Sequence, residues 1–276
     1  MSPPSRRVEA NSITPPEHSS EPILLADLSG QIARITLNRP DQRNALSDEL
    51  LTDLRDALER CAAAEHVRVV VIGGSGPAFS AGHDLRELAQ ASAAEVERLF
   101  RACSDTMLLL QSLPQPVIAR VHGIATAAGC QLVAACDLAV AAEGARFATP
   151  GVSIGLFCST PAVPLVRSVG RKRAMEMLLT ATPIDAETAC AWGLVNRVVP
   201  ANMLDEAVDE LAAKIAGASR RTLALGKQAF YRQIALSEND AYALTSDAMC
   251  VNAATEDAHE GIAAFLGKRA PRWRDR

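Results

Sequence analysis

The chain has 276 residues, of which 49% are hydrophobic, and a formal net charge of −4. Its length allows one large domain or a domain with an appendage, and its apolar content is ample for a core. The weak negative charge, with no basic block, argues against a nucleic-acid partner. No apolar run approaches the roughly 18 residues of a membrane span, which argues against a membrane-spanning protein.

The N-terminus and the cysteines both predict a cytoplasmic location. Residues 1–21 have no apolar core of the signal-peptide type and contain Glu9, Glu17 and Glu21, whereas organelle-targeting segments are poor in acids. We expect this stretch to be a disordered tail. The seven cysteines are scattered, without a CxxC pair or a Cys/His cluster, which predicts reduced thiols and no metal site. The excess of arginine over lysine is typical of a GC-rich bacterial genome.

Strands and helices alternate in the first part of the chain. Residues 23–28 and 31–37 have alternating apolar positions around Ser29 and Gly30, which predicts a hairpin. Ser47 is expected to cap a helix with one apolar face. Further elements are predicted as strands at 68–72, 116–121 and 137–142, a helix at about 93–112 and a helix that begins near Gly129. This alternation predicts an α/β fold with sheet strands buried on both faces.

After about residue 160 the pattern becomes helical. Helices are expected at about 161–168, 171–180, 203–217, 220–232, 238–256 and 257–267, with one short strand at 193–195. We expect a core over residues 22–200 and a C-terminal helical oligomerisation region over residues 201–276.

Two loops carry the chemical signal. AFSAGHDLREL (78–88) and GIATAAGCQL (123–132) each follow a predicted buried strand, pass through small residues and end in a helix. Each could be a plain strand-to-helix turn, with Asp84 capping the first helix. Together they could present two backbone N–H groups at one spot. Such a pair, called an oxyanion hole, polarises a carbonyl and stabilises the enolate or tetrahedral oxyanion that develops from it.

Five blocks make the sequence recognisable: RITLNRPDQRNAL (34–46), the two loops, ARFATPGVSIGL (145–156) and EGIAAFLGKRAPRW (260–273). Their order and spacing resemble the enoyl-CoA hydratase/isomerase (crotonase) superfamily from about residue 23 to 273. Within it, the GHDL loop, the AAGCQL loop and the TPGVSIGLFCSTP stretch resemble the group called enoyl-CoA hydratase domain-containing protein 3. The resemblance implies a spiral of ββα turns with a helical C-terminal trimerisation region, and a homotrimer or dimer of trimers.

The resemblance also implies acyl-CoA as the substrate, with CoA as part of it and no further cofactor. The backbone N–H groups of His83 and Ala128 become the two oxyanion donors. The imidazole of His83 is not expected to act as an acid or base. For Phe265 and Lys268, an ordinary amphipathic helix remains an equal alternative. The implied substrate-binding residues are Arg43, Ala45, Ala81, His83, Asp84, Leu85, Ala127, Ala128, Pro150, Cys158, Phe265 and Lys268.

The sequence departs from the family pattern at two catalytic positions. Hydratases of this family use two glutamates to activate a water and deliver a proton, and these positions align with Gln131 and Gly151. An amide has no useful basicity near neutral pH, and glycine has no side chain. We therefore expect slow hydration, which changing both residues to glutamate should restore. Cys158, Ser159 and Thr160 are expected to line the acyl pocket.

Three functions remain open on the sequence. The first is an enoyl-CoA hydratase/isomerase-type lyase with weak or redirected activity, in fatty acid metabolism. The second is decarboxylation of a malonyl-type CoA thioester, in which loss of CO₂ itself generates the enolate. The third is a non-catalytic acyl-CoA binding protein that keeps the oxyanion hole for affinity.

Overall fold

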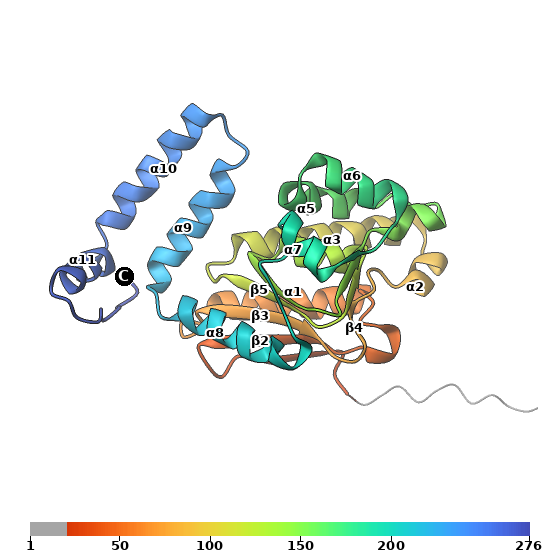
Figure 1. Cartoon of the computed structure of the whole chain (residues 1–276), viewed down its shortest axis with the longest axis horizontal. Coiled ribbons are helices and arrows are strands. Elements are labelled where there is room, and N and C mark those ends of the chain that lie inside the picture. Colours follow the sequence, from red (N-terminus) through yellow and green to blue (C-terminus); the bar gives the residue numbers. More distant parts are fainter. Residues whose placement is uncertain (1–20) are drawn as a thin grey trace, which may run out of the picture.

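The computed structural model describes residues 21–276, so the tail expected over residues 1–21 lies outside the described residues except for Glu21. The described chain is built on two β-sheets with helices packed around them. Helices α9 (Arg220–Gln233), α10 (Glu238–Ala253) and α11 (Glu256–Leu266) form an arm that stands away from this body (Figure 1).

The larger sheet has six strands in the order β1-β2-β3-β5-β7-β10. Only β1 and β2 pair in antiparallel fashion, which confirms the predicted hairpin, and the other neighbours are parallel. The central strand β3 is buried along nearly its whole length, as predicted for a strand covered on both faces. The bounds are β1 Leu24–Asp27, β2 Ile32–Leu37, β3 Val69–Gly74, β5 Val117–Val121, β7 Leu138–Ala142 and β10 Arg197–Val199.

The smaller sheet has four short strands in the order β4-β6-β8-β9, which the sequence pattern did not predict. They are β4 Ala78–Ser80, β6 Ile124–Thr126, β8 Arg146–Ala148 and β9 Ile184–Asp185. Strands β3, β5 and β7 of the larger sheet each lead into a strand of the smaller one and then into helices. This ββα unit, repeated along the chain, confirms the expected α/β spiral.

The helices follow the predicted positions closely. Ser47 caps α1, since its hydroxyl accepts a hydrogen bond from the Leu50 N–H at 3.2 Å. Helix α1 spans Asp48–Ala63. The remaining helices of the body are α2 Leu85–Gln90, α3 Ala93–Ser112, α4 Ala128–Ala135, α5 Ser159–Val169, α6 Arg171–Thr180, α7 Ala186–Trp192 and α8 Leu204–Ala216. Short 3₁₀ helices are η1 Pro40–Gln42, η2 Pro150–Ile154 and η3 Ala201–Met203.

The predicted strand at 193–195 is wrong. Gly193 ends the unpredicted helix α7 in a left-handed conformation, with φ of 90°, and the strand in this region is β10, which begins at Arg197. Gly-Leu-Val was a plausible strand start by composition, but glycine with positive φ is also the commonest way to end a helix.

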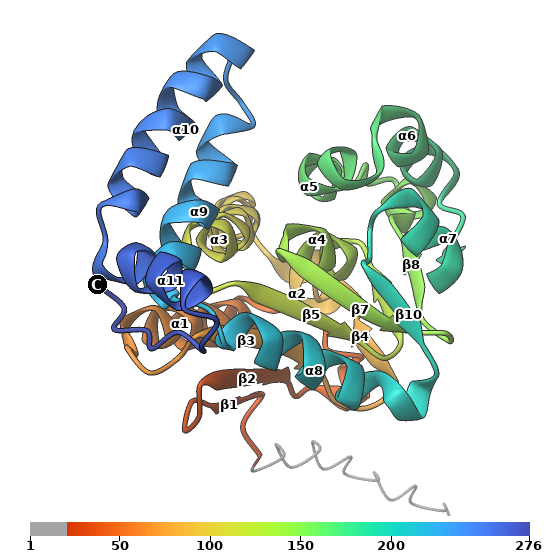
Figure 2. The ribbon, with the colours of Figure 1, turned by 60° about the vertical axis from the view of Figure 1, so that its left-hand side comes forward.

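Helices cover the larger sheet on both faces. On one face α1, α3 and α4 bury the main apolar cluster. On the other face Leu204, Val208 and Ala212 of α8 pack against the sheet residues Val69, Val71, Ile118 and Val140 (Figure 2). Helix α8 therefore belongs to the body, although it falls within the region 201–276 expected to serve oligomerisation. The part that stands apart is α9–α11.

A buried ion pair fixes the arm to the body. The Lys227 ammonium on α9 donates to the Asp137 carboxylate at 2.6 Å and to the carbonyl oxygens of Leu110 and Gln115, each at 2.8 Å. The Tyr231 hydroxyl donates to the same carboxylate at 2.8 Å. Burial lowers the pKa of Lys227, and the charge of Asp137 opposes this shift. The pair therefore joins α9 to the ends of α3 and α4.

Candidate active site

The two loops singled out from the sequence lie against each other. Gly82 has φ of 89°, and a Cβ at this position would meet the Thr126 carbonyl oxygen at 2.9 Å and the Ala127 Cβ at 2.8 Å. Only glycine allows both the left-handed backbone and this close approach. The same hypothetical Cβ would lie 3.1 Å from the Ala128 nitrogen, so the loop 81–83 passes directly beside the start of α4.

The N–H of His83 is left without a protein acceptor. Gly82 accepts a hydrogen bond from the Leu46 N–H at 2.7 Å, and the Asp84 N–H donates to the Leu46 carbonyl at 3.2 Å. Leu46 is thus hydrogen-bonded to Gly82 and Asp84, the two residues on either side of His83. The His83 N–H therefore points away from Leu46, and it donates to no protein group within residues 21–276.

The N–H of Ala128 is likewise unpaired in the described part of the chain. Ala128 is the first residue of α4, where backbone N–H groups have no partner inside the helix. Ala127 before it has φ of 49° and ψ of −117°, a rare backbone conformation for a residue other than glycine. The Ala127 N–H donates to Ala148 at 2.9 Å, which holds this turn against β8.

Both residues line one cavity of about 490 Å³, which we call the site cavity. Its wall is mostly apolar, and no Asp or Glu of the described chain lines it. Of the predicted site residues it includes Ala81, His83, Leu85, Ala127, Ala128, Pro150, Gly151 and Cys158, together with Ser159 and Thr160. Sequence reasoning missed Leu88 and Phe100, which come from α2 and α3.

The His83 imidazole forms part of the wall. Its ring packs edge-on against Phe100, with ring centroids 4.9 Å apart, and its Nε2 atom is buried without a hydrogen-bond partner among the described residues. Burial lowers the pKa of His83 to about 4. The imidazole is therefore neutral at physiological pH and presents one free polar atom in an apolar wall.

Asp84 braces the loop and lies outside the site cavity. Its carboxylate pairs with the Arg39 guanidinium at 3.1 Å and caps α2 by accepting the Arg86 N–H. Partial burial acts to raise the pKa of Asp84, but the hydrogen bonds from Arg86 and Arg39 outweigh it and lower the pKa. Arg39 also donates to the Ala45 carbonyl at 2.6 Å, so one guanidinium ties the turn at 43–46 to the loop that holds Asp84.

Gly151 lies in the wall, but the structure leaves no room for a side chain there. A Cβ would overlap the Leu156 carbonyl oxygen and lie 2.8 Å from the Cys158 sulfur. The φ of Gly151 is not in the left-handed region, so the obstacle is space and not backbone conformation. The expectation that glutamates at positions 131 and 151 would restore hydration is therefore corrected, because the loop 151–158 fills the position where the second side chain would be.

Gln131 lies beside the site cavity and does not line it. Its side chain lines a separate cavity of about 250 Å³ farther along α4, and Thr160 lines both cavities. Gln131 is 3% exposed, and its Oε1 atom has no hydrogen-bond partner in the described chain. Residues 131 and 151 therefore line different cavities. This differs from the expectation that both positions approach the same part of the substrate.

Five predicted substrate contacts do not line the site cavity: Asp84, which braces the loop, and Arg43, Ala45, Phe265 and Lys268. Arg43 is exposed next to it, and Ala45 is buried under the same turn. Phe265 is 84% exposed on α11 and Lys268 follows it, at the opposite end of the molecule from α2 (Figure 1). In both views α11 is far from α5, so Phe265 and Lys268 cannot reach the site cavity of their own chain.

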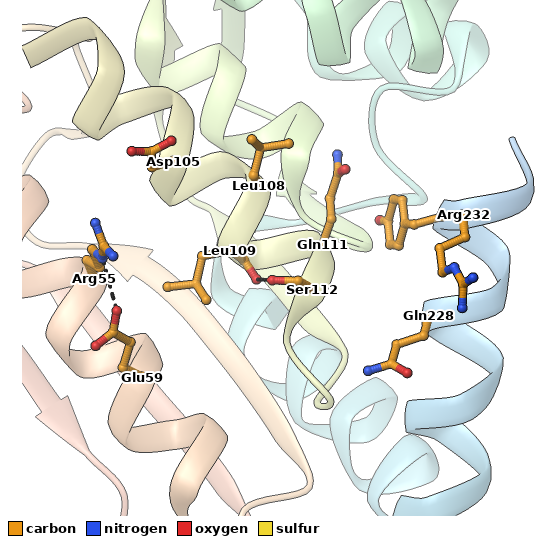
Figure 3. Close-up of a pocket in the computed structure, with 10 residues that line it drawn as sticks. Arg55, Glu59, Asp105, Leu108, Leu109, Gln111, Ser112, Gln228 and Arg232 are labelled. Atoms are coloured by element: carbon orange, nitrogen blue, oxygen red, sulfur yellow. Dashed lines mark hydrogen bonds and ion pairs between the residues drawn. The ribbon is translucent and has the colours of Figure 1, made fainter. Parts of the chain in front are cut away.

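Another cavity lies between the arm and the body. It measures about 620 Å³ and is formed by α1, α3 and α9, with the ion pair of Arg55 and Glu59 on one side and Gln228 and Arg232 on the other (Figure 3). It is more open and more polar than the site cavity, and its described lining residues lie inside helices, where backbone N–H groups are paired. It is a cleft between the arm and the body, and size alone does not make it the functional site.

Within residues 21–276, no three His, Cys, Asp or Glu side chains come together as metal ligands would. No helix there has both the length and the apolar character required to cross a membrane.

The chain matches a known family and several curated proteins. The family model described as enoyl-CoA hydratase/isomerase matches residues 27–276. The chain is 47% identical over 264 residues to rat enoyl-CoA hydratase domain-containing protein 3, mitochondrial, which covers 95% of this chain and 88% of that protein. It is 37% identical over 258 residues to 2,3-dehydroadipyl-CoA hydratase of Escherichia coli, covering 92% of this chain and 99% of that protein.

Solved structures agree with these matches. A crystal structure of an enoyl-CoA hydratase from Mycobacterium smegmatis superposes with a TM-score of 0.89 at 51% identity, covering 92% of this chain and 99% of that chain. The human enoyl-CoA hydratase domain-containing protein 3 superposes with a TM-score of 0.89 at 46% identity, covering 91% of this chain and 100% of that chain. The chain therefore belongs to the enoyl-CoA hydratase/isomerase family.

Proposed function

We propose that the chain binds acyl-CoA thioesters and stabilises a thioester enolate between the backbone N–H groups of His83 and Ala128. The observation that carries this proposal is that neither N–H group has an acceptor within residues 21–276 and that both residues line one apolar cavity. Donors that are already oriented in a dry site stabilise developing negative charge far more than donors in water. Family membership supports acyl-CoA as the ligand.

We propose that the CoA portion leaves the site cavity past the turn that holds Arg43 and Ala45. Arg43 is exposed and forms no ion pair within the described residues, so its guanidinium is free for a phosphate. Phe265 and Lys268 would then contribute to the site of another copy, which requires a homotrimer or a dimer of trimers. Apolar side chains left exposed on the arm support such an assembly: Phe230, Ile234, Tyr242, Met249, Ile262, Phe265 and Leu266.

We expect hydration to be slow. Addition of water to an enoyl thioester needs a group that takes a proton from the water, and general acid–base groups contribute about 10²–10⁴-fold to such reactions. No carboxylate of the described chain lines the site cavity, and burial lowers the pKa of the His83 imidazole to about 4, below the range near the working pH where a general base is most effective. The arrangement therefore supports slow hydration of enoyl-CoA thioesters, the reaction type of the family.

Decarboxylation of a malonyl-type CoA thioester is the second candidate. The absence of a carboxylate in the described wall favours it, because departure of CO₂ leaves the electron pair on the α-carbon without any base. The enolate formed in this way needs only the two N–H groups for stabilisation. An acyl-CoA binding protein without catalysis is the third candidate. In such a protein the two N–H groups would serve binding affinity alone.

One panel of thioesters tests these candidates. Crotonyl-CoA, malonyl-CoA and methylmalonyl-CoA would each be mixed with the full chain, and binding and product formation would be followed by calorimetry and chromatography. Slow hydration supports the first candidate, CO₂ release the second and tight binding without turnover the third. Failure of all three thioesters to bind would overturn the proposal.

A backbone variant tests the oxyanion hole itself. Proline is tolerated at the first residue of a helix, and Ala128→Pro replaces the unpaired N–H by the ring Cδ, so it deletes one donor. Glycine at position 127 avoids a clash between the proline ring and the preceding Cβ. Ala127→Gly with Ala128→Pro should lose about 10²–10³-fold in turnover relative to Ala127→Gly alone. Ala93→Pro, at the first residue of α3 outside the site cavity, is the matched control.

A further inference from the structure

The smaller cavity beside Gln131 lies next to the site cavity along the same three helices, and Thr160 lines both. Helix α4 contacts both α3 and α5 (Figure 2). On α4, Ala128 lines the site cavity and Gln131 and Ala135 line the smaller one. Residues three and seven positions apart share one helix face, so the two cavities follow each other along a single face of α4.

The other two helices show the same progression. On α3, Phe100 lines the site cavity, and Ser104, Met107, Leu108 and Gln111 line the smaller cavity. On α5, Thr160 lines both, and Val163, Pro164 and Arg167 follow it. Helices α4 and α5 therefore begin at the site cavity, α3 reaches it at Phe100, and all three continue beside the smaller cavity. At 1.5 Å of rise per residue, Arg167 lies about 10 Å along α5 from Thr160.

The polar groups of the smaller cavity are free to bind a ligand. The Arg167 guanidinium donates one hydrogen bond to the Val163 carbonyl at 2.7 Å and has no carboxylate partner within residues 21–276. Gln131 is buried with an unpartnered Oε1, and its amide can present either oxygen or N–H groups to a ligand. No acidic residue of the described chain lines this cavity.

We propose that the smaller cavity binds the tail of an acyl group that ends in a carboxylate. The proposal rests on the proposed function, because the thioester carbonyl must lie between His83 and Ala128 for the tail to pass Thr160. Methyl and methylene groups of Met107, Val163 and Pro164 would contact the chain. The Arg167 guanidinium would pair with the terminal carboxylate in the bidentate geometry that arginine favours. The ligand class is a medium-chain ω-carboxyacyl-CoA.

Two thioesters of equal chain length test this subsite. Octanoyl-CoA ends in a methyl group and suberyl-CoA ends in a carboxylate. We expect the full chain to bind suberyl-CoA about 10-fold more tightly by calorimetry, the size expected for one charge-assisted contact at a partly exposed site. The preference should decrease as salt is added, since the ion pair is open to solvent.

Arginine variants assign the preference to a side chain. Arg167→Gln should reduce the ratio of the two affinities to about one. Arg171→Gln is the matched control, because Arg171 is an exposed arginine at the start of α6 that lines neither cavity, and it should keep the wild-type ratio.

Each outcome separates the two proposals. Equal or tighter binding of octanoyl-CoA by the wild-type chain overturns the carboxylate subsite and leaves the proposed function standing. A preference for suberyl-CoA that survives Arg167→Gln overturns the assignment to Arg167. Failure of both thioesters to bind overturns the proposed function as well.

Discussion

The carbonyl oxygen of Leu156 lies in the space that a Cβ on Gly151 would occupy. The Leu156 N–H also donates to the Gly151 carbonyl at 3.0 Å, so the segment 151–156 closes on itself. The space beside Gly151 is thus filled by folded backbone. A carboxylate at position 151 would require another conformation of the loop and not only another residue.

A side chain at position 151 should therefore disturb the loop. We expect Gly151→Glu, alone or with Gln131→Glu, to lower the free energy of unfolding by about 1–3 kcal/mol, the usual cost of overpacking. Crotonyl-CoA hydration should remain slow in the double variant, because the new carboxylate cannot take the required position. Urea denaturation and a hydration assay measure the two effects.

Gly144→Ala is the control for this pair, because a Cβ at Gly144 meets no atom within 4 Å. It should leave stability within about 0.5 kcal/mol of the wild type, as most surface substitutions do. A double variant that combines wild-type stability with rapid hydration would show that the loop moves aside easily and would contradict this account.

The strained turn before α4 predicts a stabilising substitution. Ala127 has φ of 49° and ψ of −117°, a region that glycine enters at little cost. Ala127→Gly should raise the free energy of unfolding by about 1 kcal/mol, since strained backbone of this kind costs about 1–3 kcal/mol. Thermal unfolding monitored by circular dichroism would detect the shift.

Ala213→Gly, on the exposed side of α8, is the matched control for a glycine in ordinary helical geometry. It should lower stability by about 1 kcal/mol. If both substitutions destabilise the chain equally, the backbone of Ala127 is not strained, which would contradict this prediction.

Most of the larger sheet and the long helices could be predicted from sequence because each has a strong local pattern. The helix at Ala93–Ser112 and the capped helix after Ser47 have clear apolar faces and start signals. The smaller sheet could not be predicted in the same way. Strands of three residues such as Ala78–Ser80 and Ile124–Thr126 are too short to show a period and are defined by their partners.

The candidate site was partly predictable for a related reason. Glycine and other small residues in the two loops indicate close backbone approach, and the structure brings Gly82 and Ala128 together. Phe100 gave no comparable signal, because its contact with His83 joins residues from separate elements. The position of Gln131 in a second cavity depends on how α3 and α5 pack beside α4, which no local pattern encodes.

The buried imidazole predicts a specific pH dependence of stability. The pKa of His83 is lowered from its ordinary value near 6.5 to about 4 by burial. Between these values the unfolded chain binds a proton at this residue and the folded chain does not, so stability falls as the pH falls from about 6.5 towards 4. The full effect is on the order of 3 kcal/mol, from 1.36 kcal/mol per pKa unit.

His83→Leu should remove this part of the pH dependence while keeping the backbone N–H. Denaturation at several pH values between 4 and 7 would show a smaller slope for the variant than for the wild type. His259→Gln, on an exposed position of α11, should keep the wild-type slope. An unchanged slope in His83→Leu would mean that the imidazole is more hydrated than its buried Nε2 indicates.

The Lys227–Asp137 pair predicts how firmly the arm is held. The Lys227 side chain is 7% exposed and that of Asp137 is 16% exposed. Lys227→Met leaves the Asp137 carboxylate without its cation and should lower the free energy of unfolding by about 3–5 kcal/mol. Lys214→Met, at an exposed position of α8, should change it by less than about 0.5 kcal/mol. Equal stability of the two variants would show that the ion pair is not needed to fix α9.

The most direct test of the oxyanion-hole account is a crystal structure of the chain with an acyl-CoA bound. The account predicts that the thioester carbonyl oxygen lies about 2.7–3.1 Å from the backbone nitrogens of both His83 and Ala128. The acyl chain should then follow α4 towards Gln131. A carbonyl oxygen that contacts neither nitrogen, or an acyl-CoA bound in the cleft between the arm and the body, would contradict the account.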